Sequence, residues 1–459
     1  MGYYNSITPN VILRNILENP GWYTSYTPYQ PEVAQGRLEM LLNFQQTIID
    51  LTGMDIANAS LLDEATATAE AVGLSQRLDK TNSKKIFISS NCNPQTIDLI
   101  KTRTEPFGLE LIIGDEKKEL TKINEDIICG VLSYPGTLGE IIDPSESISQ
   151  IHKKNGKAIL VCDLLALAKL KTPSELGADI AVGSAQRFGI PMGYGGPHAA
   201  FFATKDEYKR SMPGRIVGVS VDRHGNKAYR LSLQTREQHI RRDKATSNIC
   251  TAQALLAIIS AAFAIYHGPE GILKIANRTS KLAKIFGDEI KSGGYKILSN
   301  HYFDTVTVKT ENKTDTIYSA ALKENINLRK VDDTSISVAF DEAKKLNDVN
   351  VLLKIFGITK NIKQDTKVEL SNLPNNLKRT SKYLTHPVFN KYHSETEMLR
   401  YLKKLEDCDI ALNRSMIALG SCTMKLNATA ELIPITWKEF SLPHPFVPTD
   451  QMKGYKILF

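Results

Sequence analysis

Short apolar runs alternate with polar stretches between residues 85 and 204, and this alternation constrains the fold more than any other feature of the sequence. The polar stretches are compatible with helices, and apolar runs of this length are typical of strands buried inside a sheet. Strands that alternate with helices favour a mostly parallel, helix-covered sheet. We therefore predict an α/β domain on the runs KIFISS (85–90), LELIIG (109–114), ICGVLSYP (128–135), KAILVCD (157–163), ADIAVGS (178–184) and HAAFFAT (198–204).

Three helices are predicted before this sheet. Thr8 can cap a first helix that has Pro9 at its first position. A second helix should run from about residue 31 to residue 51, because leucines and isoleucines recur on one face and Gly53 follows its end. A third should begin after Asp63, whose carboxylate can accept the free N–H groups of the first turn.

The composition changes after an apolar helix near residues 252–266. Residues 268–362 mix helices with short strands, which predicts a second, smaller α/β domain. Residues 363–384 are polar and rich in Lys, Asn and Pro, as is typical of a linker. The next stretch, 385–417, is interpreted as helical and charged.

Length and composition limit the class of protein. With 459 residues, of which 42% are apolar and 23% charged, the chain is long enough for two or three domains. Its best apolar run, residues 254–266, is shorter than the ~18 residues that a membrane span needs. Residues 1–9 lack the basic start and the apolar stretch of a signal peptide, so we expect a cytoplasmic protein without a membrane partner.

Cysteine spacing and charge argue against metal and nucleic-acid binding. The six cysteines are scattered, with no CxxC pair and no histidine at ligand spacing, so we predict reduced thiols and neither a metal site nor a disulfide framework. The formal charge of +7 comes mostly from lysines spread along the chain, without interleaved aromatic residues. An acidic protein partner or an anionic substrate suits this charge better than nucleic acid.

The stretch VGSAQRFGIPMGYGGPH (182–198) is similar to the cofactor-lysine turn of a pyridoxal-phosphate enzyme, but its lysine is missing. Gln186 stands where the Schiff-base amine is expected, and glutamine cannot form an imine. Arg187 is no substitute, because its guanidinium is never deprotonated. The glycines of the turn also have a purely structural interpretation, since they let the backbone turn tightly before the next strand.

Two further positions have a cofactor interpretation and a structural one. Asp163 ends a predicted strand, where it could face a pyridinium nitrogen or simply cap a helix. A phosphate loop is expected near residues 61–70, at a helix N-terminus. Asp63 and Glu64 already occupy that end, and two carboxylates repel a dianionic phosphate. This segment is therefore better interpreted as a self-capped structural helix.

The end of the sequence repeats its beginning. Residues 420–446 and 2–29 share an initial glycine, a short amphipathic helix, a tryptophan, and then Pro-aromatic-x-Pro. The pattern is loose enough to arise by chance. If it is a true repeat, the chain holds one whole unit and the start of a second.

Seven long runs make the chain resemble one family, the P-proteins of the glycine cleavage system, or glycine dehydrogenases (decarboxylating). They are spread over almost the whole chain, from residue 23 to residue 437, and are very specific. They are YTSYTPYQPEVAQGRLEMLLNFQ (23–45), NASLLDEATATAEA (58–71), GSAQRFGIPMGYGGPHAAFF (183–202), KRSMPGRIVGVS (209–220), QTREQHIRRDKATSNICT (234–251), THPVFNKYHSETEMLRYL (385–402) and GSCTMKLNATAELIPITW (420–437).

The resemblance implies the pyridoxal-phosphate-dependent transferase fold type I, which is aspartate-aminotransferase-like. It also implies two similar halves, of which the carboxyl half carries the cofactor lysine at the position matching Gln186. We expect a fragment that begins late and stops inside the second half. Its expected parts are an arm (1–34), a large α/β domain that is the lysine-less copy (35–267), a small α/β domain (268–362), a linker with a helical connection (363–417) and the start of the catalytic half (418–459).

The resemblance also implies an activity and its partners. Family members use pyridoxal 5'-phosphate to decarboxylate glycine and transfer the aminomethyl group to the lipoyl group of H-protein. Expected partners are therefore glycine, H-protein and the carboxyl half, in a homodimer or heterotetramer. The compartment would be mitochondrial in a eukaryote. This chain alone should be inactive; the alternative is a non-catalytic structural or regulatory subunit that pairs with a separate lysine-bearing subunit.

The resemblance finally suggests site residues. Asp163, Gln186 and Asn93 are vestigial cofactor positions, and Asn93 stands where relatives often have a histidine that could stack on the cofactor. Other side chains are candidates for lining an active site shared with the carboxyl half. These are Tyr26, Tyr29, Glu32, Ser421, Cys422 and Lys425. Tyr26 and Tyr29 could equally pack at a proline-rich turn, and Lys425 could be a solvated surface lysine.

Overall fold

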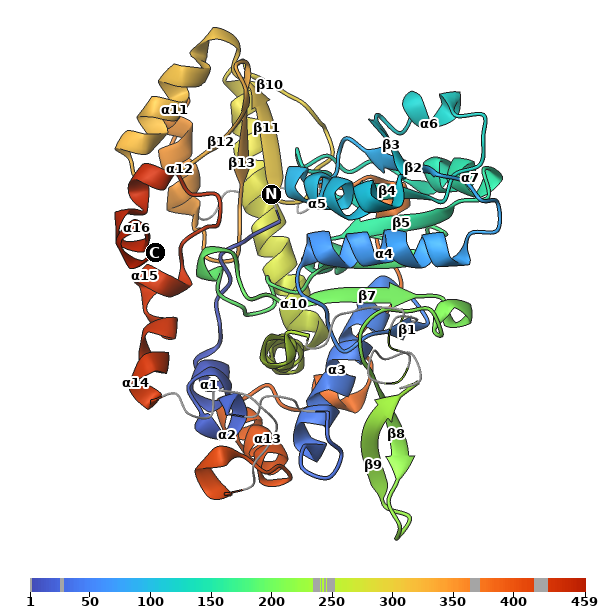
Figure 1. Ribbon diagram of the computed structural model, residues 1–459. Coiled ribbons are helices and arrows are strands. Elements are labelled where there is room, and N and C mark those ends of the chain that lie inside the picture. Colours follow the sequence, from blue (N-terminus) through green and yellow to red (C-terminus); the bar gives the residue numbers. More distant parts are fainter. Residues whose placement is uncertain are drawn as a thin grey trace.

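A seven-stranded sheet forms the centre of the protein in the computed structural model, which describes residues 2–24, 29–233, 240, 242, 245, 252–363, 372–416 and 428–459 (Figure 1). Its strand order is β1-β7-β6-β5-β4-β2-β3, with β2 to β6 parallel to one another and β7 antiparallel to both of its neighbours, β6 and β1. The mostly parallel sheet and its six predicted strands are thereby confirmed. The strands are β1 (Ile56–Ala57), β2 (Lys85–Ser89), β3 (Glu110–Gly114), β4 (Cys129–Tyr134), β5 (Lys157–Cys162), β6 (Ile180–Ser184) and β7 (Ala200–Thr204).

The central strands are apolar throughout because both faces of the sheet are buried. Successive side chains of a strand point to opposite faces. Thus Leu160 joins the core on one face, with helices α3 (Gln35–Thr52) and α10 (Ala254–Ser292). Its neighbour Ile159 joins the core on the other face, with α4 (Glu64–Leu78).

The ends of two predicted helices are confirmed, and one prediction is wrong. Gly53 follows α3 in the left-handed conformation, with φ of 69°, and Asp63 caps α4 by accepting the Thr66 N–H at 2.7 Å. Thr8, however, caps no helix: its hydroxyl donates to the Gly189 carbonyl at 2.6 Å. The first helix, α1, instead spans Asn10–Ile12 and continues as a π-helical turn.

Helix α10 is longer than the apolar run predicted from sequence, because the helical path continues beyond a kink at Gly268. Its length and hydropathy would suffice to cross a membrane, but 67% of its most apolar 18-residue window is buried inside the protein. Its first part packs in the core under the large sheet, and its last turns join the core of the small domain. These contacts make it a core helix that connects the two domains.

The second domain has a four-stranded antiparallel sheet of order β10-β11-β13-β12. A separate hairpin, β8 with β9, projects beside α3 (Figure 1). The strands are β8 (Ile216–Val221), β9 (Lys227–Ser232), β10 (Lys296–Ile297), β11 (Thr305–Lys309), β12 (Arg329–Asp332) and β13 (Ser335–Ala339). The remaining helices are α2 (Pro20–Tyr23), α5 (Pro94–Thr104), α6 (Glu119–Lys122), α7 (Ser145–Lys153), α8 (Leu164–Leu167), α11 (Thr314–Lys323), α12 (Leu346–Ile355), α13 (Glu395–Asp407), α14 (Thr429–Leu432), α15 (Lys438–Ser441) and α16 (Lys453–Leu458).

The end of the chain, residues 428–459, is here called the tail, and it contains α14 to α16. It lies along one side of the molecule in Figure 1. Ile433, Trp437 and Phe446 are 53%, 51% and 47% exposed, so the tail presents apolar surface. By contrast, residues 372–384 of the predicted linker pack against the large domain, where the Arg379 guanidinium donates to three carbonyl oxygens.

Candidate functional site

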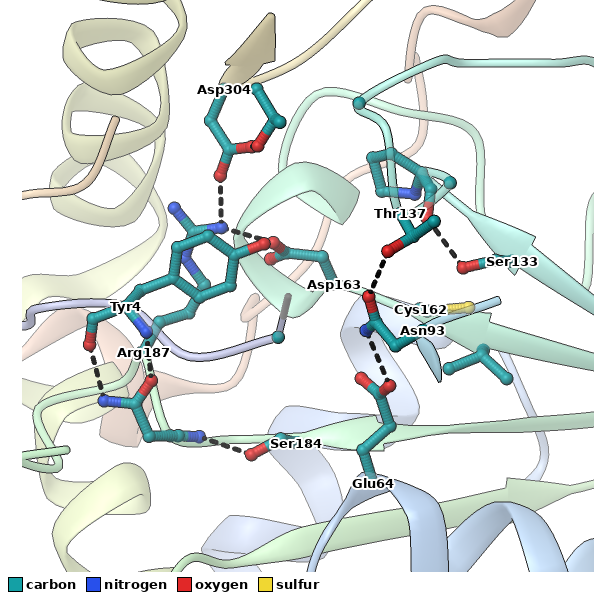
Figure 2. A pocket seen from close by; sticks show the side chains of 17 residues that line it. Tyr4, Glu64, Asn93, Ser133, Thr137, Cys162, Asp163, Ser184, Arg187 and Asp304 are labelled. Atoms are coloured by element: carbon teal, nitrogen blue, oxygen red, sulfur yellow. Dashed lines mark hydrogen bonds and ion pairs between the residues drawn. The ribbon is translucent and has the colours of Figure 1, made fainter. Parts of the chain in front are cut away.

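A small pocket lies where the parallel strands of the large sheet end, which is the edge at which such sheets bind ligands (Figure 2). All three vestigial cofactor positions line it: Asn93 follows β2, Asp163 follows β5 and Gln186 follows β6. Its volume is about 50 Å³. The sequence therefore placed these side chains at one site, although the roles assigned to them remain predictions.

The Gln186 side chain is fully engaged by backbone groups. Its amide oxygen accepts the Tyr4 N–H at 2.9 Å, and its amide nitrogen donates to the Tyr4 carbonyl at 2.7 Å. The same nitrogen also donates to the Ile190 carbonyl at 2.6 Å. The glutamine thus holds a peptide segment from the beginning of the chain at the position expected for the Schiff-base amine.

Asp163 is held between a helix and an arginine. One carboxylate oxygen caps α8 by accepting the Leu165 N–H at 2.8 Å, as the structural interpretation predicted. The other accepts the Arg187 guanidinium, and the same guanidinium nitrogen donates to Asp304 at 2.7 Å. The acid that could face a pyridinium nitrogen is therefore paired with a cation from the chain itself.

The tyrosine of the bound segment completes this side of the pocket. The Tyr4 ring lies over the Arg187 guanidinium, with 3.7 Å from the guanidinium carbon to the ring centre. Burial lowers the pKa of Arg187, but Asp163 and Asp304 outweigh burial, so the pKa lies above its usual value. Arg187 stays charged and holds two carboxylates and one aromatic ring together.

The opposite side of the pocket is an amide network around Asn93. Its amide nitrogen donates to Glu64 at 3.0 Å, and its amide oxygen accepts the Thr137 hydroxyl at 2.8 Å. Glu64 also accepts the Thr96 hydroxyl at 3.0 Å, and burial raises the pKa of this glutamate. No stacking ring comes from this position.

Pyridoxal phosphate does not fit these residues. Gln186 offers no amine, Asp163 is paired with Arg187, and Asp63 and Glu64 stand at the helix end where a phosphate would bind. A volume of about 50 Å³ holds a few water molecules, since each needs roughly 10–15 Å³. A ring with a phosphate group cannot enter while Tyr4 is in place.

The candidates for a shared active site lie elsewhere or outside the described residues. Tyr29 is buried with its ring 4.8 Å from the Arg215 guanidinium, whereas Glu32 is exposed, and neither lines the pocket as the structure describes it. Tyr26, Ser421, Cys422 and Lys425 lie outside the described residues. A role in a shared site stays a prediction for all six.

The sequence did not point to Tyr4, Asp304 or Thr137, and Arg187 was considered only as a nucleophile. Asp304 is 117 residues from Arg187, and Tyr4 is 182 residues from Gln186. Neither lies in a motif, so no local signal could have found them. The one indication was that Arg187 has no counter-charge near it in the sequence. A buried arginine requires such a charge, so its partner had to come from a distant part of the chain.

Comparisons with known proteins agree on one family. The family model described as "Glycine cleavage system P-protein" matches residues 1–356. The glycine dehydrogenase (decarboxylating) of Pelagibacter ubique is 74% identical over 459 residues, which is all of this chain and 48% of that protein. The chain thus spans about half the length of the curated relatives it matches.

Solved structures support the same conclusion. A glycine decarboxylase (P-protein) of the glycine cleavage system in inhibitor-bound form is 31% identical, with a TM-score of 0.72 over 77% of this chain and 83% of that one. A C-DES mutant with glycine covalently linked to its PLP cofactor is 14% identical, with a TM-score of 0.54 over 77% of this chain and 96% of that one. The second match concerns the fold alone. Together they confirm the predicted fold type I architecture.

Proposed function

Because the chain belongs to the glycine cleavage system P-protein family, we propose that it forms the lysine-less part of a P-protein. The whole protein would decarboxylate glycine with pyridoxal phosphate and transfer the aminomethyl group to the lipoyl group of H-protein. The observation that carries this assignment is Gln186, whose side chain binds the Tyr4 backbone instead of supplying an amine. The cofactor would then bind to the other half of the protein.

This chain would contribute structure rather than a chemical step. Its pocket is filled by the Tyr4 segment, and its charged groups are paired with one another. The exposed apolar side chains of the tail offer a surface for the carboxyl half, because patches of this kind mark protein interfaces. Activity would require both halves together.

Reduction with borohydride tests the assignment. The purified chain is incubated with pyridoxal phosphate, reduced and digested, and the lysines are surveyed by mass spectrometry. We expect no internal-aldimine absorbance and no stoichiometric adduct at one lysine. The same chain co-expressed with its carboxyl half should yield one adduct, on that half. Before reduction, this complex should also release carbon dioxide from glycine when lipoylated H-protein is supplied as the acceptor of the aminomethyl group. A stoichiometric adduct on this chain would overturn the proposal.

A matched variant controls for nonspecific reaction. Burial lowers the pKa of Lys169 to about 8, which leaves more of its amine unprotonated than in an ordinary lysine. Its ammonium donates to the Ser280 hydroxyl at 2.7 Å, away from the pocket-lining residues. K169R should remove any background adduct and leave activity with the carboxyl half unchanged.

The second candidate is a natural subunit that pairs with a separate lysine-bearing chain. This chain covers 83% of the solved P-protein chain, so that P-protein chain is of comparable size. This observation favours a separate subunit. Sequencing the gene beyond the codon for Phe459 distinguishes the two candidates. A continuous reading frame into a lysine-bearing half supports a fragment, whereas a stop codon and a separate gene for that half support a subunit.

A further inference from the structure

The segment Gly2–Thr8, here called the arm, lies in the pocket as an extended peptide. Alternate residues bind the turn after β6: Tyr4 pairs with Gln186, Ser6 donates its hydroxyl to the Arg187 carbonyl at 3.1 Å, and Thr8 donates to the Gly189 carbonyl at 2.6 Å. Alternate residues of an extended chain point the same way. The turn therefore binds one edge of the arm at regular intervals, as a peptide-binding groove does.

The other edge of the arm binds the small domain. The Asn5 N–H donates to Asp341 at 3.2 Å, and the Ile7 N–H donates to Glu342 at 3.0 Å. The Ser6 hydroxyl reaches the same Glu342 carboxylate at 3.3 Å. The arm thus bridges the two domains at the place where the resemblance would put a cofactor.

The arm also contacts the tail. The Tyr3 ring packs against His444 and Phe446, with ring centres 5.9 and 5.7 Å apart. Its neighbour Tyr4 is fixed by two backbone bonds to Gln186, so the position of Tyr3 depends on that anchor.

Two more contacts of the tail use the glycine-rich turn, while Gln451 of the tail exchanges hydrogen bonds of 2.8 and 2.9 Å with Asn327. The Tyr194 N–H donates to the Pro443 carbonyl at 2.9 Å, and the Tyr194 ring lies 4.6 Å from that of Tyr455. The arm and this turn therefore meet the tail side by side.

We propose that the lysine-less pocket is a peptide-binding site whose ligand is the arm, and that the bound arm positions the tail. The ligand class is an extended peptide with an aromatic residue whose backbone N–H and C=O are both available. Gln186 binds the backbone N–H and C=O of the aromatic residue, and the Arg187 guanidinium binds its ring. Gln186 is then a positioning residue, acting on the tail through Tyr4 and Tyr3. This proposal does not depend on the activity proposed above.

Hydrogen exchange in the full chain tests the coupling. Y4A and Q186A each remove one anchor of the arm, whereas I7A shortens a side chain that is 50% exposed and serves as the matched control. We expect the Tyr194 amide to exchange about tenfold faster or more in Y4A and Q186A, and at the original rate in I7A. Protection of the Gly189 amide, which donates to Ser6 at 3.0 Å, reports release of the arm.

Rescue in trans separates binding from a general loss of structure. An acetylated peptide of residues 2–9 is added to Y4A at about millimolar concentration, near the effective concentration of a tethered segment. It should restore slow exchange at Tyr194 in Y4A but not in Y4A/Q186A. Unchanged Tyr194 exchange when the arm is released would overturn the coupling. An arm that stays protected in both variants, or equal rescue with and without Gln186, would overturn the binding site.

Discussion

The two sides of the pocket keep buried polar groups in different ways. On one side, the Arg187 guanidinium binds Asp163 and Asp304 beneath the Tyr4 ring. On the other side, Glu64 is held by the neutral donors Asn93 and Thr96, and Figure 2 shows its contact with Asn93. We call these the arginine side and the amide side.

The difference shows how each side depends on its partners. A buried ion pair offsets a large desolvation cost, so removing one partner leaves an uncompensated charge. A buried carboxyl held by neutral donors can instead bind a proton, and burial raises the pKa of Glu64 accordingly. Substitutions should therefore be far more harmful on the arginine side than on the amide side.

The largest effect is expected for R187M. It leaves Asp163 and Asp304 buried without a counter-charge, which should lower the free energy of unfolding by ~3–5 kcal/mol. Denaturant unfolding measures the loss. R278M is the control, because the exposed Arg278 donates only to two carbonyl oxygens, and its loss should stay within about 1 kcal/mol. Equal losses of unfolding free energy in R187M and R278M would show that the buried ion pairs do not make the arginine side unusually sensitive.

A smaller effect is expected for N93A. The substitution removes the donor to Glu64 and the acceptor of the Thr137 hydroxyl, so two polar groups lose a partner at a cost of ~1–3 kcal/mol. N376A removes an exposed bond to Asp143 and should cost about 0.5 kcal/mol or less. If N93A is as costly as R187M, the amide side depends on its partners as strongly as the arginine side.

E64Q should change stability little at acid pH, because the glutamate is protonated there and glutamine can accept the same two hydrogen bonds. Its effect should appear in the pH dependence. The folded pKa of Glu64 is raised, so the glutamate contributes stability below its unfolded pKa and loses that contribution as pH rises through the folded value. As pH rises from acid to neutral, the free energy of unfolding of the native protein should fall relative to that of E64Q. A difference that grows with pH in favour of the native glutamate would contradict the raised pKa.

The smallest effect is expected for Q186K, which should not gain the ability to form an imine with pyridoxal phosphate. A lysine at this position supplies an amine, but Arg187 still pairs with Asp163, and Asp63 and Glu64 still occupy the helix end. We expect no aldimine absorbance with pyridoxal phosphate. Q186M serves as the control for loss of the bonds to Tyr4. An adduct on the new lysine would show that the arginine side does not exclude the cofactor.

The fold followed from local patterns. The predicted strand at 157–163 corresponds to β5 (Lys157–Cys162), and Asp63 and Gly53 mark the helix ends where they were expected. Each of these features depends on neighbours within a few residues of one another. Thr8 shows the limit, because its hydroxyl binds a carbonyl distant in sequence, and the helix begins after it.

The candidate site was predictable only in part. Asn93, Asp163 and Gln186 follow predicted strands, so topology alone brings them to one edge of the sheet. Their partners were not predictable, because many polar residues of the chain could chemically have paired with them. Tyr4 also belongs to a short segment without secondary structure, whose course no periodicity determines.

The sequence by itself determined that position 186 carries no amine, since this is a property of glutamine and needs no fold. It also determined the strands between residues 85 and 204, because hydrophobic period acts over a few residues. Only the tertiary structure decided that Gln186 binds a peptide 182 residues away and that Arg187 joins Asp163 to Asp304. The physical reason is that a buried polar group must find a partner, while the choice among distant partners depends on how the whole chain packs.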